Sequence, residues 1–241
     1  MAGRRLIYGR RKGHRLRPGR QRLLCERLPD LQLRLPESGG IDPAALFPGA
    51  GRRLWLEIGF GGGEHLAAQA AAHPEVGMIG CEPYLSGIAR LLSIAEPLGL
   101  ANLRLVVDDA RLLLSALPDR SLQRIFVLFP DPWPKTRHHK RRIVNPTTAF
   151  ELARRLEPGG ELRLATDDAS YARAMLQVLL AQRELSWLAE RPADWRERPA
   201  DWPPTRYEEK AKAAGRSCIY LRFRRRRAGR GEGEKTLKTH H

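Results

Sequence analysis

From residue 53 onward, the chain alternates short apolar runs with longer segments that have helical spacing. The longer segments stop at proline or glycine, as helices do. Strands that alternate with helices in this way form a doubly wound, mostly parallel sheet. We therefore predict an α/β fold. The predicted strands are residues 53–60, 76–83, 103–109, 124–131 and 161–168, and the predicted helices are residues 64–73, 84–99, 110–118, 146–160 and 169–182.

The flanking segments differ in composition from this repeating region. Residues 1–50 are rich in arginine and then in proline and glycine, which is typical of a basic extension followed by a linker. Residues 51–226 are predicted to form the folded domain, and the apolar run 217–224 would close its sheet as an extra strand. That run follows a predicted loop, 191–216, in which the pentapeptide RPADW occurs twice. The basic tail, 227–241, has low complexity and ends in two histidines that resemble a tag remnant.

Charge and cysteine content restrict the classes of partner. The formal net charge is +16, which favours a polyanion, and among polyanions a nucleic acid. A membrane is disfavoured because no apolar run approaches the roughly 20 residues of a transmembrane span. Cys25, Cys81 and Cys218 lie far apart, with no spacing typical of a zinc site, so we expect no metal and a reducing cytoplasm. No apolar segment follows the basic N-terminus, so a signal peptide is also disfavoured.

An acidic residue stands at or near the end of each of the five predicted strands. Ligands of open parallel sheets bind outside the carboxyl ends of the strands, so these side chains should converge on one crevice. A purely structural sheet has little reason to place carboxylates there. The five residues are Glu57, Glu82, Asp109, Asp131 and Asp167.

The first of these ends carries the sequence EIGFGGG, in which Gly59, Gly61 and Gly63 alternate with other residues. Glycines allow a tight turn and a close approach of the backbone to a ligand. The spacing does not satisfy the G-x-G-x-x-G pattern of dinucleotide enzymes, which disfavours an oxidoreductase. It resembles the turn of class I methyltransferases that use S-adenosylmethionine. Glu82 stands where a carboxylate accepts both hydroxyls of a ribose.

Four further motifs extend the resemblance over residues 4–224. They are FPDPWPK at 129–135, RHHKRR at 137–142, ATDD at 165–168 and TRYEEKAKAAG at 205–215. Together with the arginine-rich leader, they resemble the bacterial tRNA (guanine-N7)-methyltransferases of the TrmB type. The resemblance implies a class I methyltransferase (Rossmann-like) fold, S-adenosylmethionine as cofactor and tRNA as partner.

The resemblance also implies roles for individual residues. Asp131 is the family's usual catalytic candidate. The implied cofactor-binding residues are Glu57, Gly59, Gly61, Gly63, Glu82, Asp109 and Asp131, where Asp109 takes the position that contacts the adenine and Asp108 is an alternative. The implied substrate-binding residues are Lys135, Asp167, Thr205, Arg206, Tyr207 and Glu208. The implied contacts to the RNA backbone are Arg137, His138, His139, Lys140, Arg141 and Arg142.

The expected reaction is methyl transfer to N7 of a guanine in tRNA, by resemblance guanine 46 of the variable loop. N7 has a free lone pair and no proton, so the chemistry depends on proximity and orientation rather than on a general base. Pro130, Pro132 and Pro134 stiffen the backbone around Asp131. Between them, Trp133 would stack on the base or the cofactor, or pack beneath the loop. Two alternatives stay open: methylation of another RNA base, and a non-catalytic RNA-binding protein with this fold. Whether the chain is a monomer or a homodimer also stays open.

Overall fold

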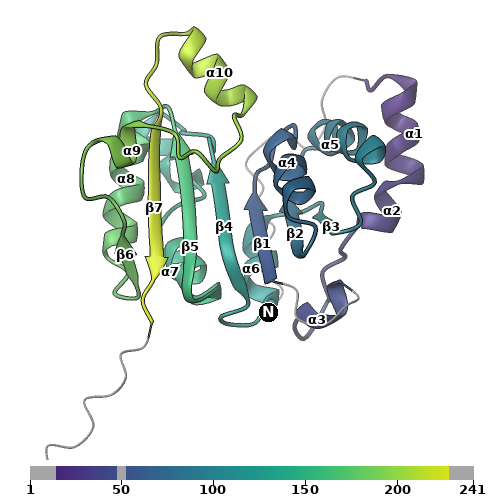
Figure 1. The fold of residues 1–241 in the computed structure, drawn as a ribbon, viewed down its shortest axis with the longest axis horizontal. Coiled ribbons are helices and arrows are strands. Elements are labelled where there is room, and N and C mark those ends of the chain that lie inside the picture. The colour runs from purple at the N-terminus through teal and green to yellow at the C-terminus, as the bar shows by residue number, and fades with distance from the viewer. Residues whose placement is uncertain (1–14, 48–52, 228–241) are drawn as a thin grey trace, which may run out of the picture.

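A seven-stranded sheet forms the centre of the computed structural model, which describes residues 15–47 and 53–227 (Figure 1). The strand order is β3-β2-β1-β4-β5-β7-β6, and β1 to β5 run parallel. The α/β class and the five parallel strands expected from the sequence are confirmed. The parallel strands are β1 (Arg53–Ile58), β2 (Val76–Cys81), β3 (Leu103–Val106), β4 (Leu122–Leu128) and β5 (Leu156–Thr166).

Helices cover both faces of the sheet because side chains on a strand alternate between the two faces. In β1, Leu56 belongs to the core beneath one helical layer, whereas Trp55 belongs to the core beneath the other. The first layer contains α6 (Ala110–Ala116), α7 (Pro146–Arg155) and α8 (Ala169–Leu180), and the second contains α4 (Glu64–Ala72) and α5 (Leu85–Leu98). Strand β5 begins at Leu156, so the residues 156–160 that were predicted to end a helix start a strand instead.

The segment before the sheet is helical where the sequence predicted an extension and a linker. Helices α1 (Pro18–Glu26) and α2 (Leu28–Leu31) lie beside α5 and β3, with Leu23 buried in the core. The amide of Leu33 donates to Leu105 O, which ties this segment to the edge strand. Helix α3 (Pro43–Leu46) leads to Phe47, which is also buried. Residues 15–47 thus pack against the sheet; the leader before residue 15 and the tail after residue 227 lie outside the described residues.

The last strand lies inside the sheet, whereas the sequence predicted that it would close the sheet. Strand β7 (Ile219–Arg225) lies between β5 and the short strand β6 (Leu185–Trp187) and is antiparallel to both. The region predicted as one loop, 191–216, contains α9 (Ala193–Arg196) and α10 (Arg206–Ala213). Helix α10 lies beyond the carboxyl ends of β4 and β5, at the edge where the predicted site residues gather (Figure 1). No helix among residues 15–47 and 53–227 is both long enough and apolar enough to span a membrane.

Candidate active site

A cavity of about 570 Å³ opens at the carboxyl ends of β1, β2 and β4. Its volume is typical of sites that bind small molecules. The lining brings together residues from five separate segments of the chain, as the strand-end rule predicts. The predicted site residues in the lining are Gly59, Gly61, Glu82, Asp109, Asp131, Arg141 and Tyr207.

The glycine turn between β1 and α4 has a left-handed backbone at all three glycines. Gly59, Gly61 and Gly63 have φ values of +70°, +55° and +78°, which disfavour any other residue. A Cβ on Gly59 would meet nothing within 4 Å, so the turn presents open backbone to the cavity. Gly63 lies outside the lining, at the N-terminus of α4, where a Cβ would approach Leu91 to 2.6 Å. Gly59 and Gly61 therefore line the cavity, and Gly63 allows close helix packing.

Glu82 lies at the floor of the cavity and is held by two backbone amides. Its Oε2 accepts from Gly61 N and its Oε1 from Tyr84 N, both at 2.9 Å. Burial raises the pKa of this carboxyl, and the nearby carboxylates Asp131 and Glu57 raise it further. The two hydrogen bonds from the amides lower the pKa, but the net shift is upward. Each carboxylate oxygen retains a lone pair, so Glu82 can accept hydroxyl donors from a ligand.

Asp109 ends the loop after β3 and caps α6. Its Oδ1 accepts from Arg111 N at 2.9 Å and its Oδ2 from Arg111 Nη1 at 2.8 Å. Asp108 lines the same cavity and its Oδ1 accepts from the amide of Asp109. Both aspartates thus lie at the cavity, with Asp109 paired with Arg111. Buried Cys81 also lines the cavity, and burial raises the pKa of its thiol, so it is neutral at pH 7.

Glu57 lies beneath the glycine turn and outside the cavity lining. It is 3% exposed, and its Oε2 is 2.7 Å from Nδ1 of His65, which is 2% exposed. The His65 ring packs edge-on against Phe126, with centroids 4.7 Å apart. The structure therefore engages Glu57 in a buried pair that the sequence analysis missed. The signal that could have found it is the spacing of the two residues, which places His65 on the first turn of the helix after the glycine turn.

The loop after β4 holds Asp131 between two residues with a left-handed backbone. Phe129 and Trp133 have φ values of +51° and +46°, an unfavourable conformation for side chains of this size. The strain is opposed by two hydrogen bonds, Phe129 N to Ala165 O at 2.7 Å and Arg142 Nε to Pro132 O at 2.8 Å. The Asp131 carboxylate is exposed at the cavity and has no hydrogen-bond partner among the described residues.

Trp133 lines the cavity and packs against the basic segment that follows it. The Arg141 guanidinium lies 4.9 Å from its ring centroid, and the His138 ring lies edge-on at 5.9 Å. The sequence left open whether Trp133 stacks on a ligand or packs with its own loop. In the free protein it packs with the loop. Partial desolvation and the neighbouring cations lower the pKa of His138, so it carries no charge at neutral pH.

The basic segment is a 3-10 helix, η1 (Thr136–Arg141), whose members differ in exposure. Arg137 and Lys140 are exposed, whereas Arg142, directly after the helix, is 5% exposed. Its guanidinium donates to Pro132 O and lies over the Tyr171 ring at 4.6 Å. In the free protein this side chain holds the loop, and its expected contact with an RNA backbone stays a prediction. His139 is partly buried, and Lys135 is exposed.

The segment Thr205–Glu208 begins α10, and only Tyr207 from it lines the cavity. Thr205 Oγ1 accepts from Glu208 N at 3.1 Å and so caps the helix. The Tyr207 ring is close to the glycine turn, since a Cβ on Gly61 would approach it to 2.9 Å. The Arg206 guanidinium lies 5.2 Å from the Tyr207 ring centroid.

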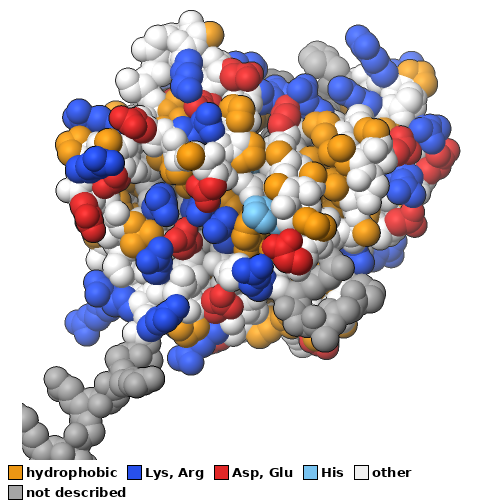
Figure 2. All heavy atoms as spheres, in the orientation of Figure 1, with side chains coloured by type: hydrophobic (Ala, Val, Ile, Leu, Met, Phe, Trp, Pro, Cys, Tyr) orange, Lys and Arg blue, Asp and Glu red, His pale blue; other side chains and the backbone are white. Residues whose placement is uncertain are grey.

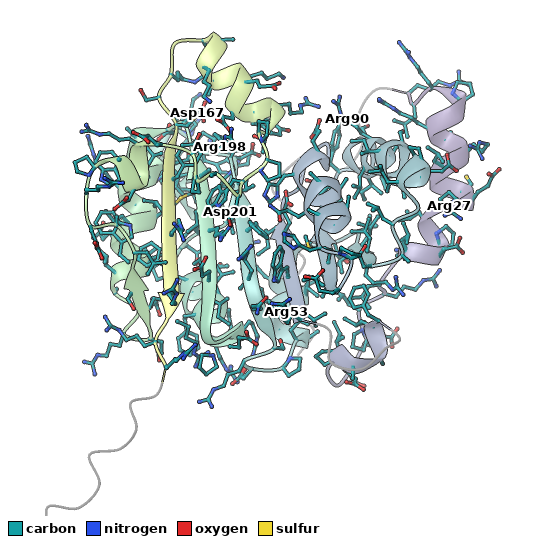
Figure 3. All side chains as sticks on the ribbon, viewed as in Figure 1. Arg27, Arg53, Arg90, Asp167, Arg198 and Asp201 are labelled. Atoms are coloured by element: carbon teal, nitrogen blue, oxygen red, sulfur yellow. The ribbon has the colours of Figure 1, made fainter. Side chains whose placement is uncertain are left out.

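Two carboxylates expected at the substrate side are engaged in ion pairs in the free protein. Glu208 is 1% exposed and pairs with Arg198 at 3.2 Å and with Lys212. Asp167, labelled in Figure 3, follows β5. Its carboxylate pairs with Arg216 at 2.8 Å. Neither lines the cavity. Within the described ranges, no group of three or more His, Cys, Asp or Glu side chains is arranged to hold a metal ion.

Comparisons with known proteins agree with this geometry. Residues 51–221 match a family model described as a putative methyltransferase. A tRNA (guanine-N(7)-)-methyltransferase of Rhodospirillum rubrum is 56% identical, with 91% of this chain and 88% of the relative covered. One from Nitrobacter hamburgensis is 49% identical, with 93% and 88% covered. A solved rRNA methylase from Streptococcus thermophilus has a TM-score of 0.50 at 13% identity, over 73% of this chain and 88% of that one, and so supports the fold alone.

Proposed function

The chain belongs to the tRNA (guanine-N(7)-)-methyltransferase family, and we propose that guanine 46 in the variable loop of tRNA is its target. It is an enzyme that transfers a methyl group from S-adenosylmethionine to N7 of a guanine. We assign Asp131 to the catalytic position. The observation that most supports this role is that its carboxylate has no hydrogen-bond partner among the described residues and lines the same cavity as Glu82 and Arg141 of η1.

The residues on the cofactor side form a site with the required chemistry. When bound, S-adenosylmethionine supplies an electrophilic methyl group on a positively charged sulfur. Glu82, already aligned by two amides, would accept hydrogen bonds from the ribose hydroxyls. Gly59 and Gly61 let the ligand approach the backbone, and Asp108 and Asp109 offer acceptors to the adenine amine. Glu57 supports this side from beneath, through its pair with His65.

On the substrate side, Asp131 acts as an electrostatic and positioning group. Positive charge moves from sulfur to the guanine ring during transfer, so a fixed carboxylate near the ring gains attraction as the reaction proceeds. The same carboxylate can accept from guanine N1–H and the exocyclic amine, which adenine cannot provide in that arrangement. Deprotonation of N7 is not needed, so Asp131 acts without serving as a base.

RNA contacts are proposed for the exposed basic groups that border the cavity. Arg137 and Lys140 lie on η1 and Lys135 precedes it, all three exposed, and the half-buried Arg141 at the end of η1 lines the cavity itself. Lys and Arg side chains on the face drawn in Figure 2 alternate with Asp and Glu and form no continuous basic surface there. A localised basic segment next to the cavity is therefore the stronger candidate for phosphate contacts. Asp167, Thr205, Arg206, Tyr207 and Glu208 complete the proposed substrate side.

Compartment and domain limits are also proposals. Cys25, Cys81 and Cys218 are all free thiols in the described structure, as suits a reducing compartment, and we assign the enzyme to the cytoplasm. Residues 51–226 are proposed as the catalytic domain.

The test is transfer of labelled methyl groups from S-adenosylmethionine to unmodified tRNA transcripts, mapped by strand cleavage specific for N7-methylguanine. We expect one cleavage site, at guanine 46. The matched control is the same transcript with adenine at that position, which should remain unlabelled. Label at another base, or no label in the parent transcript, would refute the proposed target.

A further inference from the structure

The pentapeptide RPADW occurs at 191–195 and again at 198–202, and the two copies have different surroundings. In the first copy, Asp194 accepts from the amides of Glu190 and Arg191 and pairs with the Arg191 side chain at 3.4 Å. The Arg191 side chain is 78% exposed. The Trp195 ring lies 4.6 Å from the guanidinium of the adjacent Arg196. These interactions of the first copy thus stay within a few residues of the chain.

The second copy contacts residues far away in the sequence. Its segment crosses in front of β7, β5 and β4 on the way to α10 (Figures 1 and 3). Asp201 Oδ2 accepts from Arg163 Nη1 at 2.7 Å, and Arg163 is itself 3% exposed. Trp202 is 2% exposed, with its ring edge-on to Tyr220 at 5.8 Å and the Arg163 guanidinium at 5.6 Å. This copy is therefore anchored to the face of the sheet.

The same copy is also joined to the helix that follows the glycine turn. Gln69 of α4 donates from Nε2 to Asp201 O at 3.2 Å, and Gln69 is 2% exposed. Helix α4 begins directly after Gly63. Helix α4 consequently links the glycine turn to the second copy.

Arg198 connects the second copy to the start of α10. Its Nη1 donates to Trp202 O, and its Nε donates to Glu208 Oε1 at 3.2 Å. Glu208 is 1% exposed, and its carboxylate pairs with Arg198 and with the largely exposed Lys212. Tyr207 precedes Glu208 and lies against Gly61 at the cavity. Because Tyr207 and Glu208 are adjacent, the ion pair between Arg198 and Glu208 helps to set the position of Tyr207 beside the glycine turn.

We propose that Arg198, Asp201 and Trp202 form a clasp that positions Tyr207 beside the glycine turn for tRNA methylation. These are positioning residues, because none of them lines the cavity. The inference rests on the proposed function, in which Tyr207 belongs to the substrate side. A clasp of this kind acts on tRNA use and leaves cofactor affinity unchanged, since Glu82 accepts its two hydrogen bonds from the backbone amides of Gly61 and Tyr84 and none from Tyr207.

The chain contains its own matched control for the test. Arg198→Ala removes one of the two cations paired with a buried carboxylate, and Arg191→Ala removes the same residue type from the same pentapeptide where it is exposed. We expect Arg198→Ala to lower kcat/KM for tRNA about tenfold, which corresponds to about 1.4 kcal/mol. Calorimetric Kd for S-adenosylhomocysteine should change less than about twofold, a difference of only a few tenths of a kcal/mol. Arg191→Ala should resemble the parent in both measurements, and Arg198→Lys should recover part of the loss by restoring the charge without the guanidinium fork.

Three outcomes would overturn the clasp. They are an unchanged kcat/KM in Arg198→Ala, equal losses in Arg198→Ala and Arg191→Ala, and a loss of cofactor affinity as large as the loss in kcat/KM. If Arg198→Ala does not fold, Asp201→Asn with Asp194→Asn as control replaces it under the same criteria.

A further measurement separates the clasp from the proposed function. If the parent protein methylates no tRNA, the proposed function fails, and the clasp is tested by hydrogen exchange at the Glu208 amide, which donates to Thr205 Oγ1. Faster exchange in Arg198→Ala and not in Arg191→Ala supports the clasp. Equal exchange in the two variants refutes it.

Discussion

Gly87→Ala should destabilise the protein although it adds a better helix former to α5. Gly87 is the third residue of this helix, and a Cβ there would lie 2.2 Å from Gly61 O and 3.5 Å from Glu82 Cγ. The oxygen belongs to the backbone of the glycine turn, so it cannot rotate away as a side chain could. The substitution therefore has to separate α5 from the turn.

The magnitude follows from two opposing effects. Replacing glycine by alanine inside a helix stabilises it by roughly 0.5–1 kcal/mol. Against this, the 2.2 Å contact is roughly 1 Å shorter than van der Waals separation, and overpacking of this kind costs about 1–3 kcal/mol. We expect a net loss of about 1–2 kcal/mol in the free energy of unfolding, or roughly 2–8 °C in Tm for a chain of this size.

The same displacement should weaken the cofactor site. Gly61 N donates to Glu82 Oε2, so moving the turn lengthens one of the two bonds that align this carboxylate. We expect the Kd for S-adenosylhomocysteine to rise about tenfold, equivalent to about 1.4 kcal/mol. Denaturant unfolding and calorimetric titration measure the two effects separately.

Gly19→Ala is the matched control, because Gly19 lies in α1 and a Cβ there would meet nothing within 4 Å. It should leave cofactor affinity unchanged and stabilise the protein slightly, by the roughly 0.5–1 kcal/mol of helix propensity. A Gly87→Ala variant that is as stable as Gly19→Ala and binds the cofactor normally would refute the packing argument.

Three further results are expected. Asp131→Asn should lower kcat by about 10²–10³-fold in single-turnover transfer to tRNA, because it removes charge stabilisation at the guanine; turnover near the parent rate would exclude that role. Because the pKa of Glu82 is raised above the ordinary carboxyl value of 4.5, Glu82 becomes protonated as the pH falls from neutral towards that value. Calorimetry should then show weaker cofactor binding. Protonation there should stabilise the free protein, because the folded state binds this proton more tightly than the unfolded state; a Glu82→Gln variant with the same pH dependence would contradict both signs. Arg137→Ala with Lys140→Ala should weaken tRNA binding and lower the salt slope by about 0.7–0.9 for each phosphate that is no longer neutralised, with cofactor affinity unchanged; an unaltered slope would remove η1 from the RNA-binding surface.

Strand and helix order could be predicted because it depends on local patterns. Buried parallel strands appear as short apolar runs, and the helices between them carry apolar residues at helical spacing. Strand β6, with three residues, is too short for such a pattern. Helices α1 and α10 are rich in charged residues and are held by a few buried side chains such as Leu23 and Ala211, so composition alone suggested an extension and a loop.

The sequence by itself determined three features: the succession of parallel strands and helices along the chain, the glycine turn, and the edge of the sheet where carboxylates gather. Each follows from residue types at fixed spacing along one segment. Only the tertiary structure decided which of those residues face the cavity. It directs Glu82 into the cavity, places Glu57 beneath the turn with His65, buries Arg142 directly after the exposed basic residues of η1, and anchors one of two identical pentapeptides at Asp201. Apart from the Glu57–His65 pair, whose members are eight residues apart, these outcomes depend on partners distant in the chain, and a local pattern carries no information about which distant side chains will surround it.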